Sequence, residues 1–525
     1  MSALLWTIQQ AHALSLLHSA RAWRQALADP EKTQHHLWDD LIHRHAQSAY
    51  GRAMGFDRIY SIEQYQDRVP VVDYEAVRPW VDRIAEGEQG VLTQSPVLML
   101  EPTGGSTSVS KFIPYTAELL ADFSRATNPW LADLYKQVAG LKGTQSYWSI
   151  SLAKQGARTT AGGVRIGFDD DTEYFGPLTR WALNRMMAVP SSVAQAPDMD
   201  AWRHLTCLHL LRAESLGLIS VWSPTYLSLL MDHIRDHLND LLNALPLQRR
   251  MSIEQGLHRE GRITGKALWP NLKLISCWTN SIAAAFMPEL QQCFPDTPVQ
   301  GKGLLATEGV VSVPVWGQTE GCALAVNSHF LEFMDLDHPN ARPMLAHQLK
   351  VGGHYSPIMS TSGGLYRYHL KDVVTCVGYE SQTPLIRFEG KLDRVSDLCG
   401  EKVHASQVEK AFAEARSDLG VSWRFALLAP VLGRPSHYRL FIDSDAQADQ
   451  LHLIGARVER YLHQGHHYAT CRRLGQLGGI EVQPVSHGWQ TFQQTLVNAG
   501  QRAGDIKPTA LDARHDWVKV FSVSG

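Results

Sequence analysis

Cysteine is scarce in this sequence, and the cysteines that are present do not form pairs. The 525 residues include seven cysteines, and no two of them have the CxxC spacing. They are Cys207, Cys277, Cys293, Cys322, Cys376, Cys399 and Cys471. An odd number of scattered cysteines argues against a disulfide framework and against a structural zinc site, and it favours reduced thiols in a cytoplasmic protein.

An excess of positive charge is also missing. Lysine and arginine number 49, aspartate and glutamate number 52, and the formal net charge is −3. Because a protein that holds a nucleic-acid backbone needs basic residues to neutralise phosphates, we expect no nucleic-acid partner. With 44% hydrophobic and 19% charged residues, the composition is that of an ordinary soluble globular protein.

The N-terminus lacks a long hydrophobic run. Residues 1–23 are interrupted by Gln, His or Arg every few positions. A membrane span needs about 20 consecutive apolar residues, and a signal peptide needs a basic start followed by an apolar run. We therefore expect an amphipathic N-terminal helix packed on the body of the protein, no membrane partner, and a cytoplasmic location.

The spacing of apolar residues divides the chain into helical blocks and strand blocks. Residues 1–50 have helical spacing, and a helical region is predicted from about 200 to 245. The predicted strands are 97–100, 112–113, 272–278, 298–307, 310–316 and 329–335. Because helical and strand blocks interleave, we predict the α/β class with mixed sheets.

The pattern changes near residue 390. The remainder predicts a helix at 405–415, strands at 423–428 and 438–442, and a helix at 451–462. A chain of this length holds roughly two to four domains. We predict a large N-terminal α/β domain over residues 1–392 and a small α+β cap over residues 393–525.

A loop rich in glycine and hydroxyl residues lies between the first two predicted strands. It consists of Thr103, Gly104, Gly105, Ser106, Thr107, Ser108, Val109, Ser110 and Lys111. Its N–H and O–H groups can bind phosphate oxygens, although most loops of this composition are only turns. It is not a Walker loop, because Lys111 is neither preceded by Gly nor followed by Ser or Thr. From Thr103 to Lys111 it resembles the phosphate loop S/T-x-G-S/T-T-x-x-x-K of adenylate-forming enzymes.

That resemblance implies an acidic residue for Mg²⁺, and two glutamates fit. Glu308 follows Thr307 in LLATEG, whereas Glu320 lies in the similar WGQTEG. Mg²⁺ takes one or two carboxylates together with phosphate oxygens and water. We favour Glu308 as the metal ligand, with Thr307 beside the nucleotide, because LLATEG has the spacing of such enzymes. Glu320 is then a turn residue, and the sequence alone does not decide between the two.

The resemblance also implies an acid at the ribose and a lysine on a mobile C-terminal part. Asp372 is the ribose candidate, since a carboxylate can accept hydrogen bonds from both hydroxyls; its alternative role is structural. Lys391 and Asp393 match the hinge between the two domains. Lys507, in GDIKP, is the candidate whose ammonium reaches the α-phosphate, and Lys402 is the alternative.

Longer segments resemble one family. From about residue 35 onward the chain resembles the bacterial branch of the Gretchen Hagen family of auxin-responsive acyl acid amido synthetases. The segments that carry the resemblance are 48–56, 69–88, 103–111, 268–290, 329–335 and 364–374. The resemblance implies the adenylate-forming fold of the acyl-CoA synthetase and luciferase type, with ATP and Mg²⁺ as cofactors.

The activity implied is the joining of a carboxylic acid to an amine, most plausibly an amino acid, through an acyl-AMP. Two alternatives stay open: transfer to coenzyme A or a hydroxyl, and a nucleotide-binding module without activity. The partners expected are small molecules, and a monomer is compatible with the sequence. Trp130, Trp148 and Trp222 are candidates for lining an apolar pocket for the acid.

Two positions depart from the family pattern. Ala306, Thr307 and Glu308 stand where Ser-Ser-Glu is common, and His369 stands where Arg is frequent. The first departure keeps a hydroxyl and the acid. The second could alter contacts near the ribose or the acid.

Overall fold

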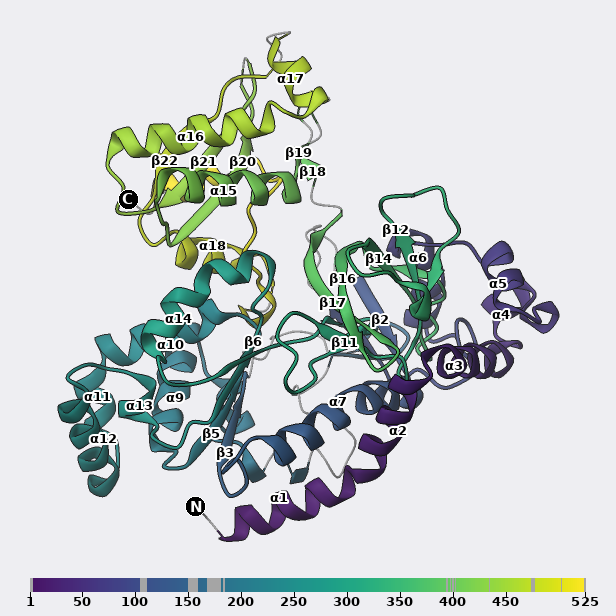
Figure 1. Ribbon diagram of the computed structural model, residues 1–525, viewed down its shortest axis with the longest axis horizontal. Coiled ribbons are helices and arrows are strands. Elements are labelled where there is room, and N and C mark those ends of the chain that lie inside the picture. The colour runs from purple at the N-terminus through teal and green to yellow at the C-terminus, as the bar shows by residue number, and fades with distance from the viewer. Residues whose placement is uncertain are drawn as a thin grey trace. The chain divides into compact units, whose positions relative to one another are not determined.

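The computed structural model describes most of the chain. The described residues are 3–103, 111–149, 159–167, 181–182, 185–392, 395–396, 398, 401, 403–433, 435–473, 477–501 and 503–523. They form two compact units, which are described separately (Figure 1). Unit 1 comprises Met1–Asn280, Met287–Leu370 and Val374–Phe388, and unit 2 comprises Ser281–Phe286, Lys371–Val373 and Glu389–Gly525. That the chain works as two domains, 1–392 and 393–525, stays a prediction.

A four-stranded parallel sheet forms one half of unit 1. Its strands, in spatial order, are β3 (Gln145–Trp148), β5 (Leu216–Ser220), β6 (Leu274–Cys277) and β7 (Val299–Gly301). Helices lie on both faces of this sheet (Figure 1). One face is covered by α7 (Ala117–Gln137), and the other by α9 (Met199–Arg212), α10 (Pro224–Asp236) and α14 (Met287–Cys293). Further helices beside this sheet are α11 (Leu238–Asn243), α12 (Leu247–Glu260) and α13 (Gly265–Leu268).

Successive residues of the central strands point to opposite faces of this sheet. Leu218 and Leu274 pack with α7, whereas Ile219 and Ile275 pack with α9 and α10. All four are buried, as expected for a parallel sheet covered on both sides. The prediction of a continuous helical region from 200 to 245 is therefore wrong, because β5 interrupts it. A short apolar run buried on both faces has no alternation that would distinguish it from a helix.

A largely antiparallel sheet forms the other half of unit 1. Its order is β10 (Ser312–Val313), β11 (Cys322–Leu324), β17 (Thr383–Lys391), β16 (Asp372–Glu380), β14 (His354–Ser360), β12 (Phe330–Asp335) and β13 (Met344–Leu345), and β15 (Tyr368–His369) also pairs with β14. A smaller sheet has the order β2 (Lys111–Tyr115), β1 (Met99–Thr103) and β4 (Arg165–Ile166). The predicted α/β class with mixed sheets is confirmed.

The predicted strands 298–307 and 310–316 are broken into four short strands: β7, β8 (Leu305–Ala306), β9 (Gly309–Val310) and β10. Glycine causes part of the break. At Gly303 an added Cβ would lie 1.9 Å from the backbone oxygen of Ser312, so two chain segments cross there in close contact. β8 and β9 pair with each other as a two-stranded hairpin.

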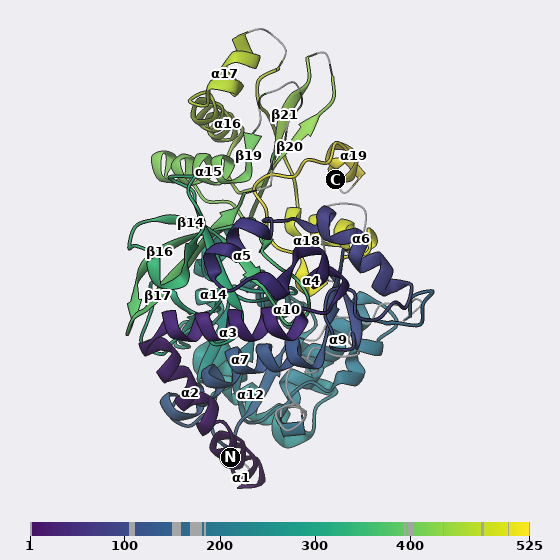
Figure 2. The ribbon, with the colours of Figure 1, turned by 90° about the vertical axis from the view of Figure 1, so that its right-hand side faces the viewer.

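The N-terminal helices α1 (Ala3–Ser15), α2 (Leu17–Ala28) and α3 (Pro30–His45) follow one another along one side of unit 1 (Figure 2). The fully buried residues of α1 are polar, namely Gln9 and His12. Gln9 Nε2 donates to the backbone oxygen of Thr144 at 2.8 Å, while Leu4 and Trp6 are exposed. The predicted packing of the N-terminal helix on the body of the protein thus depends partly on hydrogen bonds. No helix among the described residues is long and apolar enough to cross a membrane.

Unit 1 is completed by short helices. They are α4 (Ala49–Met54), α5 (Ile62–Arg68), α6 (Tyr74–Ala85) and the 3₁₀ helices η1 (Phe56–Arg58), η3 (Ser191–Gln195) and η5 (Ala346–Gln348). Each α-helix begins at a side-chain cap. Ser48, Ser61 and Asp73 accept a hydrogen bond from a backbone N–H two or three residues later.

Unit 2 is a three-stranded sheet with helices on both faces. β20 (Phe425–Val431) is antiparallel to β21 (His437–Asp443), which is parallel to β22 (Glu481–Pro484). α15 (Ala405–Leu419) and α16 (Ala448–Leu462) pack side by side on one face (Figure 1), and α18 (Gly488–Asn498) and α19 (Trp517–Val523) pack on the other. The remaining elements are β18 (Val395–Ser396), β19 (Val403–His404), α17 (His466–Arg473), η4 (Ser281–Phe286) and η6 (Ala503–Asp505).

Candidate active site

Thr307 and Glu308 form the tip of the β8–β9 hairpin. Leu305 pairs with Val310 and Ala306 with Gly309, so Thr307 and Glu308 are the two residues between the paired positions. Both are partly exposed, whereas Gly309 and Val310 are buried. The hairpin therefore presents a carboxylate at its tip and is anchored by its second strand.

Two tyrosines hold the tip of this hairpin. Tyr115, the last residue of β2, donates its hydroxyl to the backbone oxygen of Thr307 at 2.5 Å. Tyr368 on β15 donates its hydroxyl to Glu308 Oε1 at 3.4 Å. Burial and the nearby Glu308 carboxylate raise the pKa of Tyr368 far above its ordinary value, so this hydroxyl keeps its proton. Only one carboxylate oxygen of Glu308 is engaged by Tyr368.

Lys111 lies at the start of β2, opposite Thr103 at the end of β1. Its ammonium is 5.6 Å from the centre of the Tyr74 ring, within the range of a cation–π contact. The Tyr74 hydroxyl accepts a hydrogen bond from the backbone N–H of Phe112 at 2.7 Å. Tyr74 thus holds both the backbone and the side chain at the start of β2. Gly104, Gly105, Ser106, Thr107 and Ser108 lie outside the described residues.

These contacts bring two predicted groups together. β2 runs from Lys111 to Tyr115, and Tyr115 binds the Thr307 backbone, so the strands that border the predicted phosphate loop are joined to the hairpin that carries Glu308. We call Lys111, Tyr115, Thr307, Glu308 and Tyr368 the Glu308 site. The sequence reasoning missed Tyr115 and Tyr368. Tyr368 stands in YRYHLKD, a segment from which the sequence predicted roles only for Asp372 and His369.

Glu320 lies in a different setting. It is in the exposed connection between β10 and β11, and Arg387 Nη1 is 3.9 Å from its carboxylate. An exposed pair at this distance contributes little to stability. Glu320 therefore has no hydroxyl partner comparable with Tyr368 among the described residues.

The remaining predicted residues belong to unit 2. Asp372 is buried at the start of β16, and Lys391 is the last residue of β17. Lys507 is exposed and follows η6. Asp393 and Lys402 lie outside the described residues. The backbone N–H of Leu392 donates to the oxygen of Lys371 at 2.7 Å, so the end of β17 is tied to the residue before Asp372.

A buried ion pair fixes the segment before Asp372. Arg367 Nε donates to Glu332 Oε2 at 3.0 Å, and both side chains are buried. Arg367 Nη1 also donates to the backbone oxygens of Gln66 at 2.7 Å and Val69 at 2.6 Å. Because these contacts hold Arg367 on three sides, they position β15 and with it Tyr368. The neighbouring His369 forms a 2.8 Å hydrogen bond with Ser356 Oγ.

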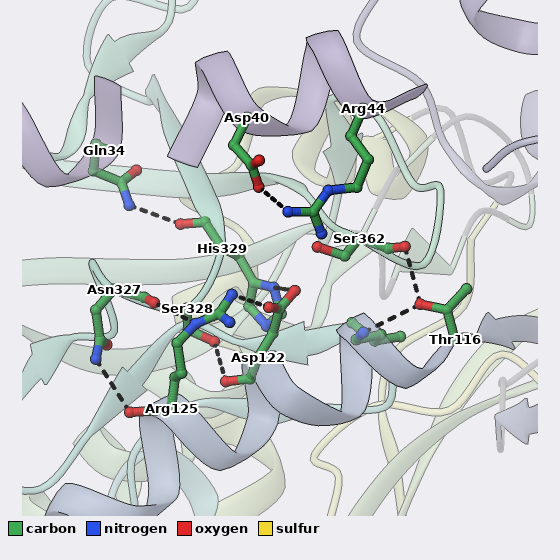
Figure 3. A network of polar contacts seen from close by, with 11 residues as sticks. Gln34, Asp40, Arg44, Thr116, Asp122, Arg125, Asn327, Ser328, His329 and Ser362 are labelled. Carbon is green, nitrogen blue, oxygen red and sulfur yellow. Dashed lines mark hydrogen bonds and ion pairs between the residues drawn. The ribbon is translucent and has the colours of Figure 1, made fainter. Parts of the chain in front are cut away.

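His329 packs against the hairpin, and Figure 3 shows the polar residues around its side chain. An added Cβ at Gly309 would be 2.7 Å from His329 Nε2, so the imidazole packs against the Gly309 backbone. On its other side, His329 Nδ1 is 3.7 Å from Asp122 Oδ2, and Arg125 pairs with the same carboxyl group. Burial lowers the pKa of His329 to about 3 and raises that of Asp122 to about 7. The imidazole is therefore neutral at physiological pH.

The residues of the Glu308 site fit a magnesium ion that is shared with a substrate. Mg²⁺ needs only one or two protein carboxylates when phosphate oxygens and water complete its shell. Glu308 is partly exposed and keeps an oxygen that Tyr368 does not engage. The described residues include no group of three or more His, Cys, Asp or Glu side chains that could hold a metal. They therefore form no site that binds a metal through protein ligands alone.

Three family descriptions match successive parts of the chain. The GH3 family N-terminal domain matches residues 20–249, the GH3 family central domain matches 322–391, and the GH3 family C-terminal domain matches 406–513. The chain belongs to the GH3 family. The resemblance predicted from the sequence segments is thus confirmed, while the assignment to a bacterial branch stays a prediction.

The GH3 relatives are distant but cover nearly the whole chain. The 4-substituted benzoates-glutamate ligase GH3.12 of Arabidopsis thaliana is 21% identical over 90% of this chain and 91% of its own. The jasmonoyl-L-amino acid synthetase JAR4 of Nicotiana attenuata is 20% identical over 89% of this chain and 88% of its own. The solved structure of the AtGH3.15 acyl acid amido synthetase in complex with 2,4-DB has a TM-score of 0.83 at 20% identity, over 98% of this chain and 96% of that one. The chain therefore has the GH3 fold, and the fold prediction is confirmed.

Proposed function

We propose that this protein is an ATP-dependent ligase that adenylates a carboxylic acid and transfers the acyl group to the amine of an amino acid. The observation that carries the proposal is the Glu308 site, where a carboxylate at a hairpin tip is joined to the strands that border a phosphate-loop sequence. Membership of the GH3 family, whose relatives include a benzoate-glutamate ligase and a jasmonoyl-amino acid synthetase, supports it.

The reaction has two steps. In the first, an oxygen of the acid's carboxylate attacks the α-phosphorus of ATP, an O–P bond forms, the bond to the β-phosphate oxygen breaks, and pyrophosphate leaves. In the second, the amine nitrogen attacks the acyl carbon, the bond to AMP breaks, and AMP leaves with the electron pair. The nitrogen loses its proton to solvent. The carboxylate needs activation because oxide is a very poor leaving group.

The chain's own residues have defined tasks in the first step. The loop from Thr103 to Ser108 offers N–H and O–H donors to the phosphates, and Lys111 adds a positive charge beside it. Glu308 would hold the magnesium ion, and Thr307 would lie beside the nucleotide. When bound, Mg²⁺ neutralises charge on the phosphates. Tyr368 keeps the Glu308 carboxylate oriented through its hydrogen bond.

Residues of unit 2 complete the proposal. Asp372 accepts hydrogen bonds from the ribose hydroxyls, which places the α-phosphate. Lys507 supplies a cation to the charge that develops on the α-phosphate. Lys391 and Asp393 form the hinge about which the C-terminal part moves between the two steps.

The test is exchange of labelled pyrophosphate into ATP in the presence of single carboxylic acids. We expect exchange that depends on the acid. Glu308→Gln should lower its rate by about 10²–10³-fold, because a preorganised charge is lost. Glu320→Gln is the matched control, since it makes the same change in the similar WGQTEG sequence, and it should leave the rate within about twofold of the wild type.

Three results would contradict parts of the proposal. Absence of any acid-dependent exchange would favour a nucleotide-binding module without activity. A larger effect of Glu320→Gln than of Glu308→Gln would assign the metal to Glu320. If coenzyme A rather than amino acids accepted the acyl group, the product would be a thioester.

A further inference from the structure

The carboxyl ends of the parallel strands in unit 1 carry an unusual set of side chains. β3 ends at Trp148 and β5 ends at Ser220, with Trp222 two residues later. β7 ends at Gly301 and is followed by Lys302. In open α/β sheets, ligands bind outside the carboxyl ends of the strands. Lys302 and the two tryptophans therefore lie at the edge of the sheet where a substrate is expected.

Lys302 is surrounded by three indole rings. Its ammonium lies 5.0 Å from the Trp222 ring centre, 5.4 Å from that of Trp130 and 5.8 Å from that of Trp148, all within the range of cation–π attraction. It donates a hydrogen bond to Ser220 Oγ at 2.8 Å. We call Lys302, Ser220, Trp130, Trp148 and Trp222 the Lys302 cage.

Neighbouring groups hold the cage in place. Trp130 on α7 donates its indole N–H to Gln300 Oε1 at 2.8 Å, and Trp130 and Trp148 pack edge to face with ring centres 5.7 Å apart. Trp222 lies against Trp278, 5.7 Å between ring centres. The rings are therefore fixed by their own partners and do not depend on Lys302 for their orientation.

The cation in this cage has no anionic partner among the described residues. Its ammonium contacts one neutral hydroxyl and three aromatic rings. Burial lowers the pKa of Lys302 to about 8, which leaves the ammonium mostly protonated near pH 7. The titratable neighbour is Cys277 on β6, whose pKa is raised to about 12 by burial, so it stays a neutral thiol.

Packing alone does not account for a lysine at this position. Taking an ammonium out of water is costly, and a buried charge is ordinarily paired with an opposite charge. A residue such as Met would fill the same space between apolar rings without that cost. Although the Lys302 ammonium is desolvated, the residues Lys302, Trp148 and Trp222 each keep some exposed surface.

We propose that the Lys302 cage recognises the acid substrate, with the Lys302 ammonium bound to its carboxylate and the tryptophan faces packed against an aromatic body. This inference rests on the proposed function and names the substrate class as aromatic carboxylic acids. A carboxylate supplies the counter-charge that the described residues do not provide. Indole faces and edges favour offset or edge-to-face contacts with another ring, which a straight alkyl chain cannot make.

Binding without ATP tests this assignment independently of catalysis. The probes are phenylacetate and octanoate, which have eight carbons each, and the readout is quenching of tryptophan fluorescence. We expect phenylacetate to bind more tightly than octanoate. Lys302→Met should weaken phenylacetate binding by about 10–100-fold, the loss typical of a hydrogen bond to a charged group. Lys302→Arg should restore most of the affinity.

Lys273→Met is the matched control. Lys273 is a partly buried lysine that immediately precedes β6, at the opposite edge of the same sheet. Its loss should leave phenylacetate binding unchanged. The pH dependence is a second readout that a structural role would not affect. Wild-type affinity should fall above about pH 8 as Lys302 loses its proton, and Lys302→Arg should remove that fall.

The outcomes separate this inference from the proposed function. Absence of quenching by phenylacetate, equal binding in Lys302→Met and the wild type, or equal weakening in Lys273→Met would overturn the inference. So would octanoate binding as tightly as phenylacetate. If Lys302→Met keeps the wild-type KM for the acid while pyrophosphate exchange proceeds, the inference fails and the proposed function stands. If Lys302-dependent binding occurs without any exchange, the proposed function fails.

Discussion

Tyr368 shows how one hydroxyl can act on the site through another side chain. It does not reach the nucleotide in the proposal, but its 3.4 Å hydrogen bond constrains the carboxylate of Glu308. It is itself positioned by β15, which the buried Arg367–Glu332 pair holds in place. Tyr368 is therefore a positioning residue.

Tyr368→Phe should slow acid-dependent pyrophosphate exchange by up to about tenfold and raise the Mg²⁺ concentration for half-maximal rate. The effect stays small because the hydrogen bond is long, and one such bond is worth roughly 1.5 kcal/mol. Tyr379→Phe is the control, since it removes a hydrogen bond to the Leu349 oxygen away from Glu308. A shift in rate with no change in Mg²⁺ dependence would contradict the assigned role.

The buried His329 makes stability depend on pH. Its pKa is about 3 in the folded protein and about 6.5 when unfolded, so between these values the unfolded chain binds one more proton. The contribution of the neutral imidazole to the free energy of unfolding is complete above pH 6.5, and it is lost as the pH falls toward 3. Asp122 acts in the opposite direction: its raised pKa favours the folded state below pH 3.8, and this gain is lost as the pH rises to about 7.

His329→Gln should therefore change the slope of the unfolding free energy against pH by about 1.4 kcal/mol per pH unit relative to the wild type between pH 4.5 and 6.5, toward less loss of stability on acidification, since one proton uptake on unfolding is removed. Urea unfolding at a series of pH values measures the slope, whatever the absolute stability of the variant. His354→Gln, at an exposed position on β14, should keep the wild-type slope. Equal slopes for all three proteins would show that His329 is not the group responsible.

At the residue scale, the sequence singled out Glu308 but not the residues that contact it, and the role of Glu308 as metal ligand stays a prediction. The choice of Glu308 over Glu320 came from spacing along the chain. Neither Tyr115 nor His329 was predicted, because Tyr115 is 192 residues from Thr307 in sequence and contacts it only after folding. A local pattern carries no information on such a pair.

The β8–β9 hairpin is the element on which the proposed metal ligand depends. Its strands have two residues each, so ladder hydrogen bonds alone cannot fix it. Its position is set by packing of Gly309 against His329 and Met359. A side chain at Gly309 would occupy the space of those two groups.

Gly309→Ala should therefore shift the hairpin and lower exchange activity by at least about tenfold. A Cβ there would lie 2.7 Å from His329 Nε2 and 2.9 Å from Met359 Sδ, and overpacking of this kind costs about 1–3 kcal/mol. Gly378→Ala is the control, because its nearest contact would be an ordinary 3.8 Å to Leu385. Wild-type activity in Gly309→Ala would show that the site does not need the present hairpin position.

A helix with one exposed face was predicted correctly, whereas of two neighbouring strands buried along their whole length β6, predicted as 272–278, was found and β5 was missed. The helix predicted at 405–415 begins at Ala405 as observed, because its apolar residues Val408, Ala411, Phe412 and Ala415 recur at helical spacing. β5, by contrast, is buried along its whole length and lies directly before another helix, so its apolar run was read as part of that helix.

At the scale of the whole molecule, the order of motifs along the chain is enough to indicate the family. It does not predict which segments that are distant in sequence contact one another in the fold. Arg367 binds the backbone of Gln66 and Val69, about 300 residues away, and so ties α5 to β15. The Lys302 cage likewise gathers residues from α7, β3, β5 and the segments that follow β5 and β7. These contacts require the folded topology.

Lys507→Ala tests whether Lys507 acts in only the first of the two proposed reaction steps. If Lys507 reaches the α-phosphate only during adenylation, its loss removes a cation needed in that transition state alone. Removing one preorganised charge donor typically costs about 10²–10³-fold in rate. The acid and ATP should still bind to the variant, because the phosphate loop and the Lys302 cage are unchanged. Pyrophosphate exchange measures this first step.

Chemically synthesised acyl-AMP isolates the second step. Added to Lys507→Ala with the amine, it should give amide at close to the wild-type rate, since the missing cation is not used in that step. Equal damage to both steps would mean that Lys507 orders the C-terminal part generally. Undamaged adenylation would mean that Lys507 is a solvated surface residue, as its exposure allows, and Lys402 would be the next candidate.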